Sequence, residues 1–429
     1  MEEKIAVIGA GSTGLFTSIE LARRGFSVSL FDRGIPGSGT SGRFHGLLHC
    51  GARYAVVDRT AATDCRAESE RIKSIAPHCV NSTGGLFVAL DRNDEEYGEE
   101  LRLNLNRCSI PYTELNGSEA VRAEPNLNAV VRSAIRVPDA VLKGRRFLLS
   151  ALGTCIAYGV SFHPFMNLLS AHDDESGDIE GLSFENRIGG GVHRASTDFV
   201  VNCSGPWIGQ TSKLLGHRVE VLPAAGVMSV VGKRLTSSVV SRMRRPSDGD
   251  ILVPYGETTI AGTTAAVTED PASFEINEED VGLLLDEASA MVPQIGRLGF
   301  ARSYASFRPL VKEETGSVRE VTRDFRILSY DAGPRNVVNV AGGKMTTSRL
   351  VGERTATEVC NALGVRKPPA GELRLIDPLD DIRTVEAGAG GDNTAIERIV
   401  AEMRGGTDDE DTNFVRELAA LVMKWSGAG

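Results

Sequence analysis

The most constraining feature of the sequence is a glycine-rich turn close to its beginning. Residues 5–8 are all apolar, which is typical of a buried strand, and Gly9, Gly11 and Gly14 follow at the spacing G-x-G-x-x-G. The first glycine permits a tight turn, the second lets a pyrophosphate approach the backbone, and the third lets a helix pack against the strand. This order predicts a Rossmann-like fold that binds a dinucleotide.

A second strand and an acidic residue complete this pattern. The helix after the turn is expected to end at Gly25, residues 27–31 are typical of a strand, and Asp32 stands at the end of that strand. A carboxylate in that place accepts hydrogen bonds from a ribose, and the helix N-terminus favours a pyrophosphate. A glycine-rich turn in another α/β fold would leave Asp32 unexplained. The motif alone fits FAD and NAD equally.

Length and composition exclude several classes of protein. The chain has 429 residues, of which 41% are hydrophobic and 24% charged, so it is long enough for two ordinary globular domains. Its net charge of −10 argues against a nucleic-acid partner, although it allows a local basic site for a small anion. Seven cysteines without a C-x-x-C pair are typical of free thiols in a reducing compartment. We expect neither a signal peptide nor a membrane-spanning segment, and therefore a cytoplasmic protein.

A dense run of basic and aromatic residues follows the dinucleotide motif. It holds Arg43, His45, His49, Arg53 and Tyr54. One basic residue would fit a basic, partly buried turn. Two arginines, two histidines and a tyrosine beside a cofactor turn favour a site that binds an anion or polarises an oxygen atom.

Two later segments repeat the change from a buried strand to glycine. Residues 199–203 lead into Gly205, and residues 337–340 lead into Gly342 and Gly343 at the start of a helix. In a doubly wound sheet such turns return to the same cofactor. A helix N-terminus with paired glycines also favours an anion or a reduced ring with negative charge.

Between these segments the pattern changes to strands with a period of two. Residues 218–326 contain several such strands and one helix over 278–291, which predicts a mixed sheet that forms a substrate domain. Near the end of the chain, helical patterns at 394–403 and 413–425 flank the acidic run 408–411. We expect a small helical extension there with a solvated acidic face.

Six segments between positions 42 and 349 carry a more specific pattern than the opening motif. They read GRFHGLLHCGARYA at 42–55, RPSDGDILVP at 245–254, IAGTT at 260–264, SFRPL at 306–310, VTRD at 321–324 and GGKMTTSR at 342–349. With them the sequence resembles the FAD-dependent glycerol-3-phosphate dehydrogenases of the glycine-oxidase and D-amino-acid-oxidase (DAO) superfamily, in particular the large subunit of the anaerobic bacterial enzyme. The resemblance covers residues 4–363. It implies a role in glycerol metabolism, in which hydride from carbon 2 of sn-glycerol 3-phosphate reduces the flavin N5 and yields dihydroxyacetone phosphate.

The resemblance also implies which residues surround the substrate. A phosphate dianion is best held by guanidinium and ammonium groups. The residues that match the family's substrate-binding positions are Arg53, Tyr54, Arg308, Arg323 and Lys344. Arg308 and Lys344 are expected to be catalytic as well, since a cation beside the C2 hydroxyl stabilises the developing alkoxide. His49 is a candidate for the proton acceptor, and the alternative is that it only packs against the flavin.

The same resemblance implies non-covalently bound FAD and no metal site. The FAD contacts are expected from the dinucleotide motif, from the loop and strand after Asp32, and from the two later glycine turns. They are Gly9, Gly11, Ser12, Thr13, Gly14, Asp32, Arg33, Thr40, Ser41, Gly42, His45, Gly46, Leu48, Gly205, Gly343, Lys344, Met345 and Thr346.

The expected fold is of the α/β (α+β) class. It combines a Rossmann-like FAD-binding domain of the glutathione-reductase/DAO type with an inserted mixed-sheet substrate domain. The predicted ranges are 1–90, 145–217 and 330–363 for the FAD-binding domain, 91–144 and 218–329 for the substrate domain, and 364–429 for the helical extension.

Three functional interpretations stay open at this level. The first is a glycerol-3-phosphate dehydrogenase that passes electrons to a partner subunit or to a quinone at the inner face of the cell membrane. The second is an oxidase or dehydrogenase of another small 2-hydroxy acid or amine, with oxygen as acceptor, and the third is a non-catalytic flavin-binding subunit. The basic residues favour a phosphate substrate and speak against the third. The anaerobic subunit continues into a cysteine-rich iron–sulfur domain, whereas no cysteine follows Cys360 here, so we expect no such cluster.

Overall fold

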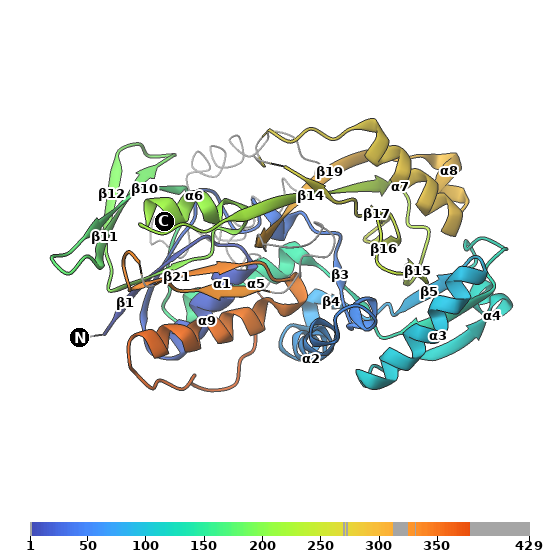
Figure 1. Cartoon of the computed structure of the whole chain (residues 1–429), viewed down its shortest axis with the longest axis horizontal. Coiled ribbons are helices and arrows are strands. Elements are labelled where there is room, and N and C mark those ends of the chain that lie inside the picture. Colours follow the sequence, from blue (N-terminus) through green and yellow to red (C-terminus); the bar gives the residue numbers. More distant parts are fainter. Residues whose placement is uncertain (1, 269–270, 272, 312–324, 331, 378–429) are drawn as a thin grey trace, which may run out of the picture.

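The computed structural model of the chain describes residues 2–268, 271, 273–311, 325–330 and 332–377. Figure 1 shows an elongated molecule, with one α/β unit around the N-terminus and a second unit at the opposite end of the long axis. The helices predicted at 394–403 and 413–425, the acidic run between them and Arg323 lie outside the described residues.

The first unit contains a six-stranded sheet. Its strands are β1 (Lys4–Ile8), β2 (Ser27–Phe31), β9 (Ser161–His163), β13 (Phe199–Asn202), β20 (Arg326–Leu328) and β21 (Val337–Ala341). They lie in the order β20-β21-β13-β1-β2-β9, and every neighbouring pair is parallel except β20 with β21. This mostly parallel sheet confirms the Rossmann-like fold that the opening motif predicts.

Three helices cover one face of this sheet. They are α1 (Ser12–Arg23), α5 (Gly144–Ala157) and α9 (Ser348–Ala362), and α1 contacts both of the others (Figure 1). The contact between α1 and α9 is close at Gly352, where a Cβ atom would lie 2.5 Å from the backbone carbonyl carbon of Phe16. A side chain at this position would therefore force the two helices apart.

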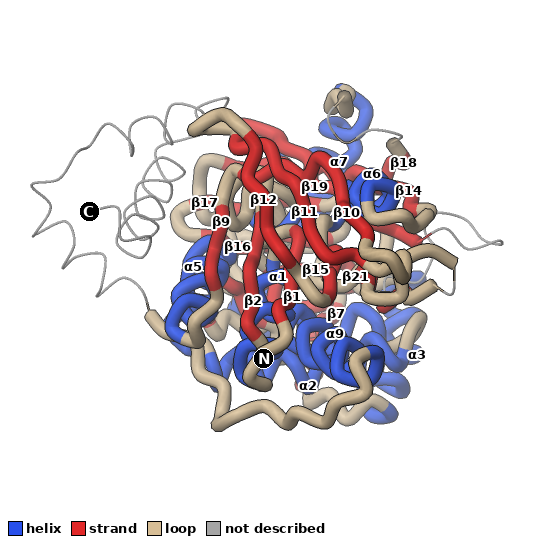
Figure 2. The backbone as a smooth tube through the Cα atoms, turned by 90° about the vertical axis from the view of Figure 1, so that its left-hand side faces the viewer, coloured by secondary structure: helices blue, strands red, loops and turns tan. Residues whose placement is uncertain are grey.

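A three-stranded antiparallel sheet covers the other face. It consists of β10 (Met166–Asp173), β11 (Ile179–Asn186) and β12 (Val192–Ser196), and Figure 2 views the molecule from its side. Successive residues of β1 alternate between the two faces, with Ile5 in the core beneath the helices and Ala6 in the core beneath this sheet. β1 is thus buried on both sides, as its continuous apolar run predicts.

The second unit is built on a nine-stranded mixed sheet. Its strands are β5 (Gly85–Ala89), β6 (Thr113–Asn116), β7 (Ser133–Val137), β14 (Val221–Val231), β15 (Val239–Arg242), β16 (Ile251–Tyr255), β17 (Thr258–Gly262), β18 (Ala266–Val267) and β19 (Arg302–Val311). Its helices are α3 (Arg92–Arg107), α4 (Gly117–Ala123), α7 (Glu278–Met291) and α8 (Gln294–Leu298). β15 is parallel to β5 and the other pairs are antiparallel, which confirms the mixed sheet expected for the substrate domain.

Two strands differ from the predicted domain limits. β20 falls within 218–329, a range predicted for the substrate domain, yet it pairs with β21 in the six-stranded sheet. β5 falls within 1–90, the range predicted for the FAD-binding domain, yet it pairs with β7 and β15 in the nine-stranded sheet. Its apolar residues suit either sheet, and its partners lie far along the chain, so the local pattern did not reveal its place. The domain limits themselves stay a prediction.

A small antiparallel sheet and α2 lie between the two units (Figure 1). The sheet consists of β3 (Leu47–Leu48), β4 (Val80–Asn81) and β8 (Ala140–Leu142), while α2 spans Arg59–Ile75. Another helix, α6, spans Ile208–Leu214 and follows β13. Within the described ranges, none of the helices combines the length and apolar character that a membrane crossing requires.

Candidate active site

A cavity of about 730 Å³ follows the carboxyl edge of the six-stranded sheet. Gly9 follows β1, Asp32 follows β2, Gly205 follows β13 and Gly342 follows β21, and all four line the cavity. In an open α/β sheet, ligands bind at this edge. Four turns that are far apart in the sequence are therefore brought together around one space.

Most of the predicted FAD contacts line this cavity. They are Gly9, Gly11, Ser12, Thr13, Asp32, Arg33, Thr40, Ser41, Gly205, Gly343, Lys344 and Met345. The predicted contacts that do not line it are Gly14, Gly42, His45, Gly46, Leu48 and Thr346. Two of these, Gly14 and Gly42, have a packing role. A Cβ atom on Gly14 would lie 1.8 Å from the carbonyl oxygen of Gly9, and one on Gly42 would lie 2.0 Å from the carbonyl oxygen of Gly37.

The turn around Asp32 has a geometry that fits a dinucleotide. Gly9 has a φ of +104°, and a Cβ atom there would lie 2.5 Å from the carbonyl oxygen of Cys203. The Asp32 carboxylate accepts the N–H of Ala10 at 2.6 Å and that of Gly34 at 2.7 Å. Burial raises the pKa of Asp32, and these two donors oppose the shift. A carboxylate has acceptor capacity beyond two hydrogen bonds, so Asp32 is able to bind ribose hydroxyls as well.

Trp207 is one of several residues of the cavity wall that are not among the predicted contacts. Trp207 lies in the 3-10 turn after β13, and the guanidinium carbon of Arg33 lies 3.8 Å from its ring centroid. Both residues line the cavity, so the pair connects the turn after β2 with the turn after β13. The available signal was the aromatic residue directly after Gly205 and Pro206, because an indole face suits a cation or a planar ring.

Several of the predicted substrate-site residues lie next to one another. The Lys344 Nζ atom lies 4.9 Å from the Tyr54 ring centroid, and the His49 and Tyr54 rings are 5.3 Å apart. The His45 ring lies 6.1 Å from that of His49, whose backbone N–H donates to Thr346 Oγ1 at 3.2 Å. The structure therefore joins the segment after β3 to the turn after β21, as the predicted site requires.

Arg308 lies next to the cavity on β19. Its guanidinium donates to the Thr263 hydroxyl and, at 3.4 Å, to the Thr264 carbonyl oxygen. Gly226 on the neighbouring strand leaves room for the side chain, since a Cβ atom there would lie 2.8 Å from Arg308 Nη2. The next residue, Pro309, lines the cavity. Arg308 itself does not line the cavity; the structure anchors it one residue away from the cavity wall.

Arg53 is engaged by another group of the protein. Its guanidinium forms a bidentate ion pair with Asp250, with an Nη2–Oδ1 distance of 2.7 Å and an Nη1–Oδ2 distance of 3.1 Å. Arg53 thus stands next to Tyr54 with its charge balanced. The other predicted substrate arginine, Arg323, lies outside the described residues.

Asp139 fixes the segment that carries these residues. It is buried and accepts the backbone N–H of Cys50 at 2.7 Å. Burial raises the pKa of the Asp139 carboxyl and that of the Cys50 thiol. Gly85 makes room for the carboxyl, because a Cβ atom there would lie 2.8 Å from Asp139 Oδ2. The local sequence gives no sign of this role, since Asp139 follows a proline and is typical of an ordinary turn.

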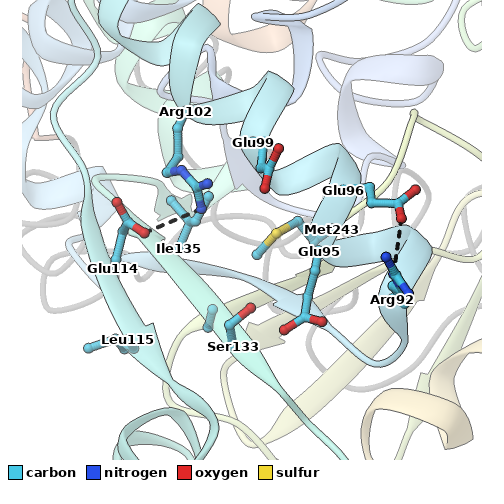
Figure 3. Close-up of a pocket in the computed structure, with 11 residues that line it drawn as sticks. Arg92, Glu95, Glu96, Glu99, Arg102, Glu114, Leu115, Ser133, Ile135 and Met243 are labelled. Carbon is cyan, nitrogen blue, oxygen red and sulfur yellow. Dashed lines mark hydrogen bonds and ion pairs between the residues drawn. The ribbon is translucent and has the colours of Figure 1, made fainter.

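A second hollow, of about 400 Å³, lies between α3 and the strands β6 and β7. Figure 3 shows charged side chains around it, with Arg92 paired to Glu96 and Arg102 paired to Glu114, both at 3.3 Å. None of the predicted site residues in the described part of the chain lines it. Exposed ion pairs of this kind explain the charged lining without a ligand.

Comparison with known proteins gives a family and several relatives. Residues 4–358 match the model of the DAO family, described as FAD dependent oxidoreductase. The chain is 35% identical over 376 residues to one subunit of the anaerobic glycerol-3-phosphate dehydrogenase of Haloferax volcanii, which covers 84% of this chain and 64% of that protein. It is 30% identical over 374 residues to the corresponding subunit of the Escherichia coli K12 enzyme, which covers 85% and 68% respectively. The chain thus spans about two thirds of the length of these relatives.

Solved structures share the fold. The glycerol-3-phosphate dehydrogenase from Bacillus halodurans, complexed with FAD, has a TM-score of 0.67 at 23% identity and covers 98% of this chain and 75% of its own. The L-α-glycerophosphate oxidase from Mycoplasma pneumoniae, with FAD bound, has a TM-score of 0.69 at 16% identity and covers 87% and 98% respectively. These likenesses confirm the fold expected from the sequence.

Proposed function

Because the chain belongs to the DAO family of FAD-dependent oxidoreductases, we propose that it oxidises sn-glycerol 3-phosphate to dihydroxyacetone phosphate with FAD as the oxidant. The observation that carries this proposal is that Lys344 lines the cavity that the dinucleotide motif encloses, while Arg308 is anchored directly before Pro309, another residue of the cavity wall. A phosphate dianion makes use of several cations, whereas a carboxylate needs fewer. The curated relatives named as glycerol-3-phosphate dehydrogenases support the same substrate.

The residues of this chain have separate roles in the proposed reaction. FAD, when bound, supplies the acceptor for the hydride that leaves carbon 2. Arg308 and Lys344 stabilise the negative charge that develops on the C2 oxygen as its proton departs. His49 is the proposed proton acceptor, because an imidazole is the commonest general base and its ring lies 5.3 Å from that of Tyr54, another residue of the proposed site. The N-terminus of α9, which follows Gly343, offsets negative charge in the cavity.

Anaerobic mixing of the purified flavoprotein with small alcohols tests the proposed function. The bound flavin should bleach with sn-glycerol 3-phosphate, whereas glycerol, which lacks the phosphate, and lactate, which carries a carboxylate, should leave it oxidised. Bleaching by lactate or glycine, with none by sn-glycerol 3-phosphate, would replace the proposal with an oxidase or dehydrogenase of a carboxylated substrate.

We expect FAD to be bound without a covalent link and to depend on Asp32. Acid denaturation should release FAD into the supernatant, and colour that stays with the precipitate would contradict the prediction. Asp32→Ala should weaken FAD binding by about 1–3 kcal/mol, because a charged hydrogen-bond acceptor at the cavity is lost. Titration of the apoprotein with FAD measures this loss. The exposed Asp286 on α7 provides the control, since Asp286→Ala should bind FAD like the wild type.

We propose that electrons leave the reduced flavin to a quinone or to a partner protein, with contact to a membrane only at its surface. An iron–sulfur cluster needs several cysteine thiolates at short spacings, and the seven cysteines of this chain are scattered, with none after Cys360. The purified chain should therefore contain flavin and no iron. Stoichiometric iron and acid-labile sulfide would contradict this expectation. Reoxidation of the reduced flavin should be fast with quinone analogues and slow with oxygen, and rapid peroxide formation would favour an oxidase.

A further inference from the structure

Asp250 is a buried carboxylate. It is not part of the dinucleotide motif, and it is not one of the predicted substrate-binding residues. It stands directly before β16, and its side chain is 0% exposed, while that of its partner Arg53 is 9% exposed. Its two oxygen atoms bind both Nη atoms of Arg53, and Oδ2 also accepts the N–H of Ser247 at 2.9 Å. The carboxylate therefore holds the guanidinium in one orientation.

The turn before β16 also connects Arg53 with Arg308. The strands β16 and β17 are paired up to this point. Beyond the last pair, the N–H of Gly249 donates to the carbonyl oxygen of Thr263 at 3.2 Å, and the Thr263 hydroxyl accepts a hydrogen bond from Arg308. Arg53 and Arg308, which come from different parts of the chain, are thus both anchored at the same end of the paired strands β16 and β17.

The position of Arg53 also affects the surroundings of Lys344. It lies in the 3-10 turn Ala52–Tyr54, so its position determines that of Tyr54. The Tyr54 ring lies 4.9 Å from the Lys344 ammonium. A displacement of Arg53 would therefore move the Tyr54 ring, beside which Lys344 lies. Asp250 would thus affect both residues, although it is adjacent to neither in the sequence.

We infer that Asp250 is a positioning residue for substrate oxidation and that it acts through Arg53. This inference rests on the proposed function. The carboxylate balances the charge of Arg53, so that Arg53 contributes orientation to the site. Removal of the carboxylate alone leaves a buried cation without a counter-charge, and such a cation attracts small anions from the solvent.

Asp250→Asn should shift two measurements in opposite directions. The rate of flavin reduction at saturating sn-glycerol 3-phosphate should fall about 10-fold or more, because small misplacements of binding groups are costly to the chemical step. Inorganic phosphate should bind about 3- to 10-fold more tightly, because the charge of Arg53 is no longer balanced. Phosphate binding is read from the absorbance of the oxidised flavin, without turnover. An ion pair with a merely structural role would give slower reduction together with weaker phosphate binding, and that result would overturn the inference.

Further variants keep the inference testable. Asp250→Glu retains the charge and should recover much of the reduction rate with wild-type phosphate affinity. The double variant Arg53→Gln/Asp250→Asn removes both charges and replaces the single variant if that one does not fold. Its flavin should be reduced slowly, and it should bind phosphate no more tightly than the wild type. A wild-type reduction rate in the double variant would overturn the inference. Asp286→Asn on the exposed face of α7 is the control. Failure of the wild-type flavin to bleach with sn-glycerol 3-phosphate would refute the proposed function, whereas the phosphate titration still decides the role of Asp250.

Discussion

Arg308→Ala is expected to slow the reduction of the bound flavin by sn-glycerol 3-phosphate about 100- to 1,000-fold, the cost of removing one group that stabilises developing negative charge. The guanidinium is held by the Thr263 hydroxyl and the Thr264 carbonyl oxygen, and Gly226 leaves space for it. An arginine fixed in this way needs no reorganisation when the C2 oxygen becomes negative. The loss should therefore appear in the rate at saturating substrate, measured by anaerobic stopped-flow absorbance.

Two further variants separate this effect from a general loss of charge. Arg302 lies on the same strand and is exposed, so Arg302→Ala should reduce its flavin at the wild-type rate. Arg308→Lys keeps a positive charge but lacks the planar fork that fits the two anchoring oxygen atoms, so its rate should fall between those of alanine and arginine. A wild-type reduction rate in Arg308→Ala at saturating substrate would remove Arg308 from the catalytic residues.

The cofactor-binding half of the molecule follows from local sequence patterns. β1, α1 and β2 form within residues 4–31, and two glycines of the motif have a steric reason that involves a near neighbour or the end of the next parallel strand: Gly14 against Gly9, and Gly9 against Cys203. The turns after β13 and β21 carry the same combination of apolar strand and glycine. Because parallel strands end at one edge of the sheet, their convergence on one cavity was predictable.

The contacts that hold the substrate residues were not predictable in the same way. Arg53 and Asp250 are 197 positions apart, and Cys50 and Asp139 are 89 positions apart. Neither acidic residue stands in a spacing that reveals its partner, since each contact depends on how the nine-stranded sheet and the small sheet meet. The sequence therefore predicts that Arg53 belongs to the site, but it does not predict that its charge is already balanced.

A similar limit applies to α2, whose composition is typical of a surface helix. Its charged residues conceal a buried face that includes Glu68 and Cys65. The partner of Glu68 is Arg349 of α9, which lies 281 positions away. The pairing becomes visible only when α2 packs against the region where α9 begins.

Arg349→Ala is expected to lower the free energy of unfolding by about 3–5 kcal/mol, the usual loss when one partner of a buried ion pair is removed. Arg349 Nη2 lies 2.6 Å from Glu68 Oε1, and Nε donates to Glu68 Oε2 at 2.9 Å. The side chains of Arg349 and Glu68 are only 13% and 6% exposed, so water cannot replace the missing partner. Burial lowers the pKa of Arg349, but Glu68 and Glu353 outweigh it and raise the pKa above its usual value. The variant would therefore leave Glu68 as a buried, unpaired carboxylate.

Urea unfolding of the FAD-free and FAD-loaded forms measures this loss. Arg366 is exposed, so Arg366→Ala should change the free energy of unfolding by less than about 0.5 kcal/mol and serves as the control. Glu68→Gln/Arg349→Met removes both charges and should be more stable than Arg349→Ala, because no carboxylate remains buried without a partner. The opposite order, or a loss below about 1 kcal/mol in Arg349→Ala, would show that solvent reaches Glu68. Arg349 lies in the first turn of α9, two residues after the 3-10 turn Met345–Thr347 that Lys344 caps, so the ion pair links the stability of α9 to the geometry of the proposed active site.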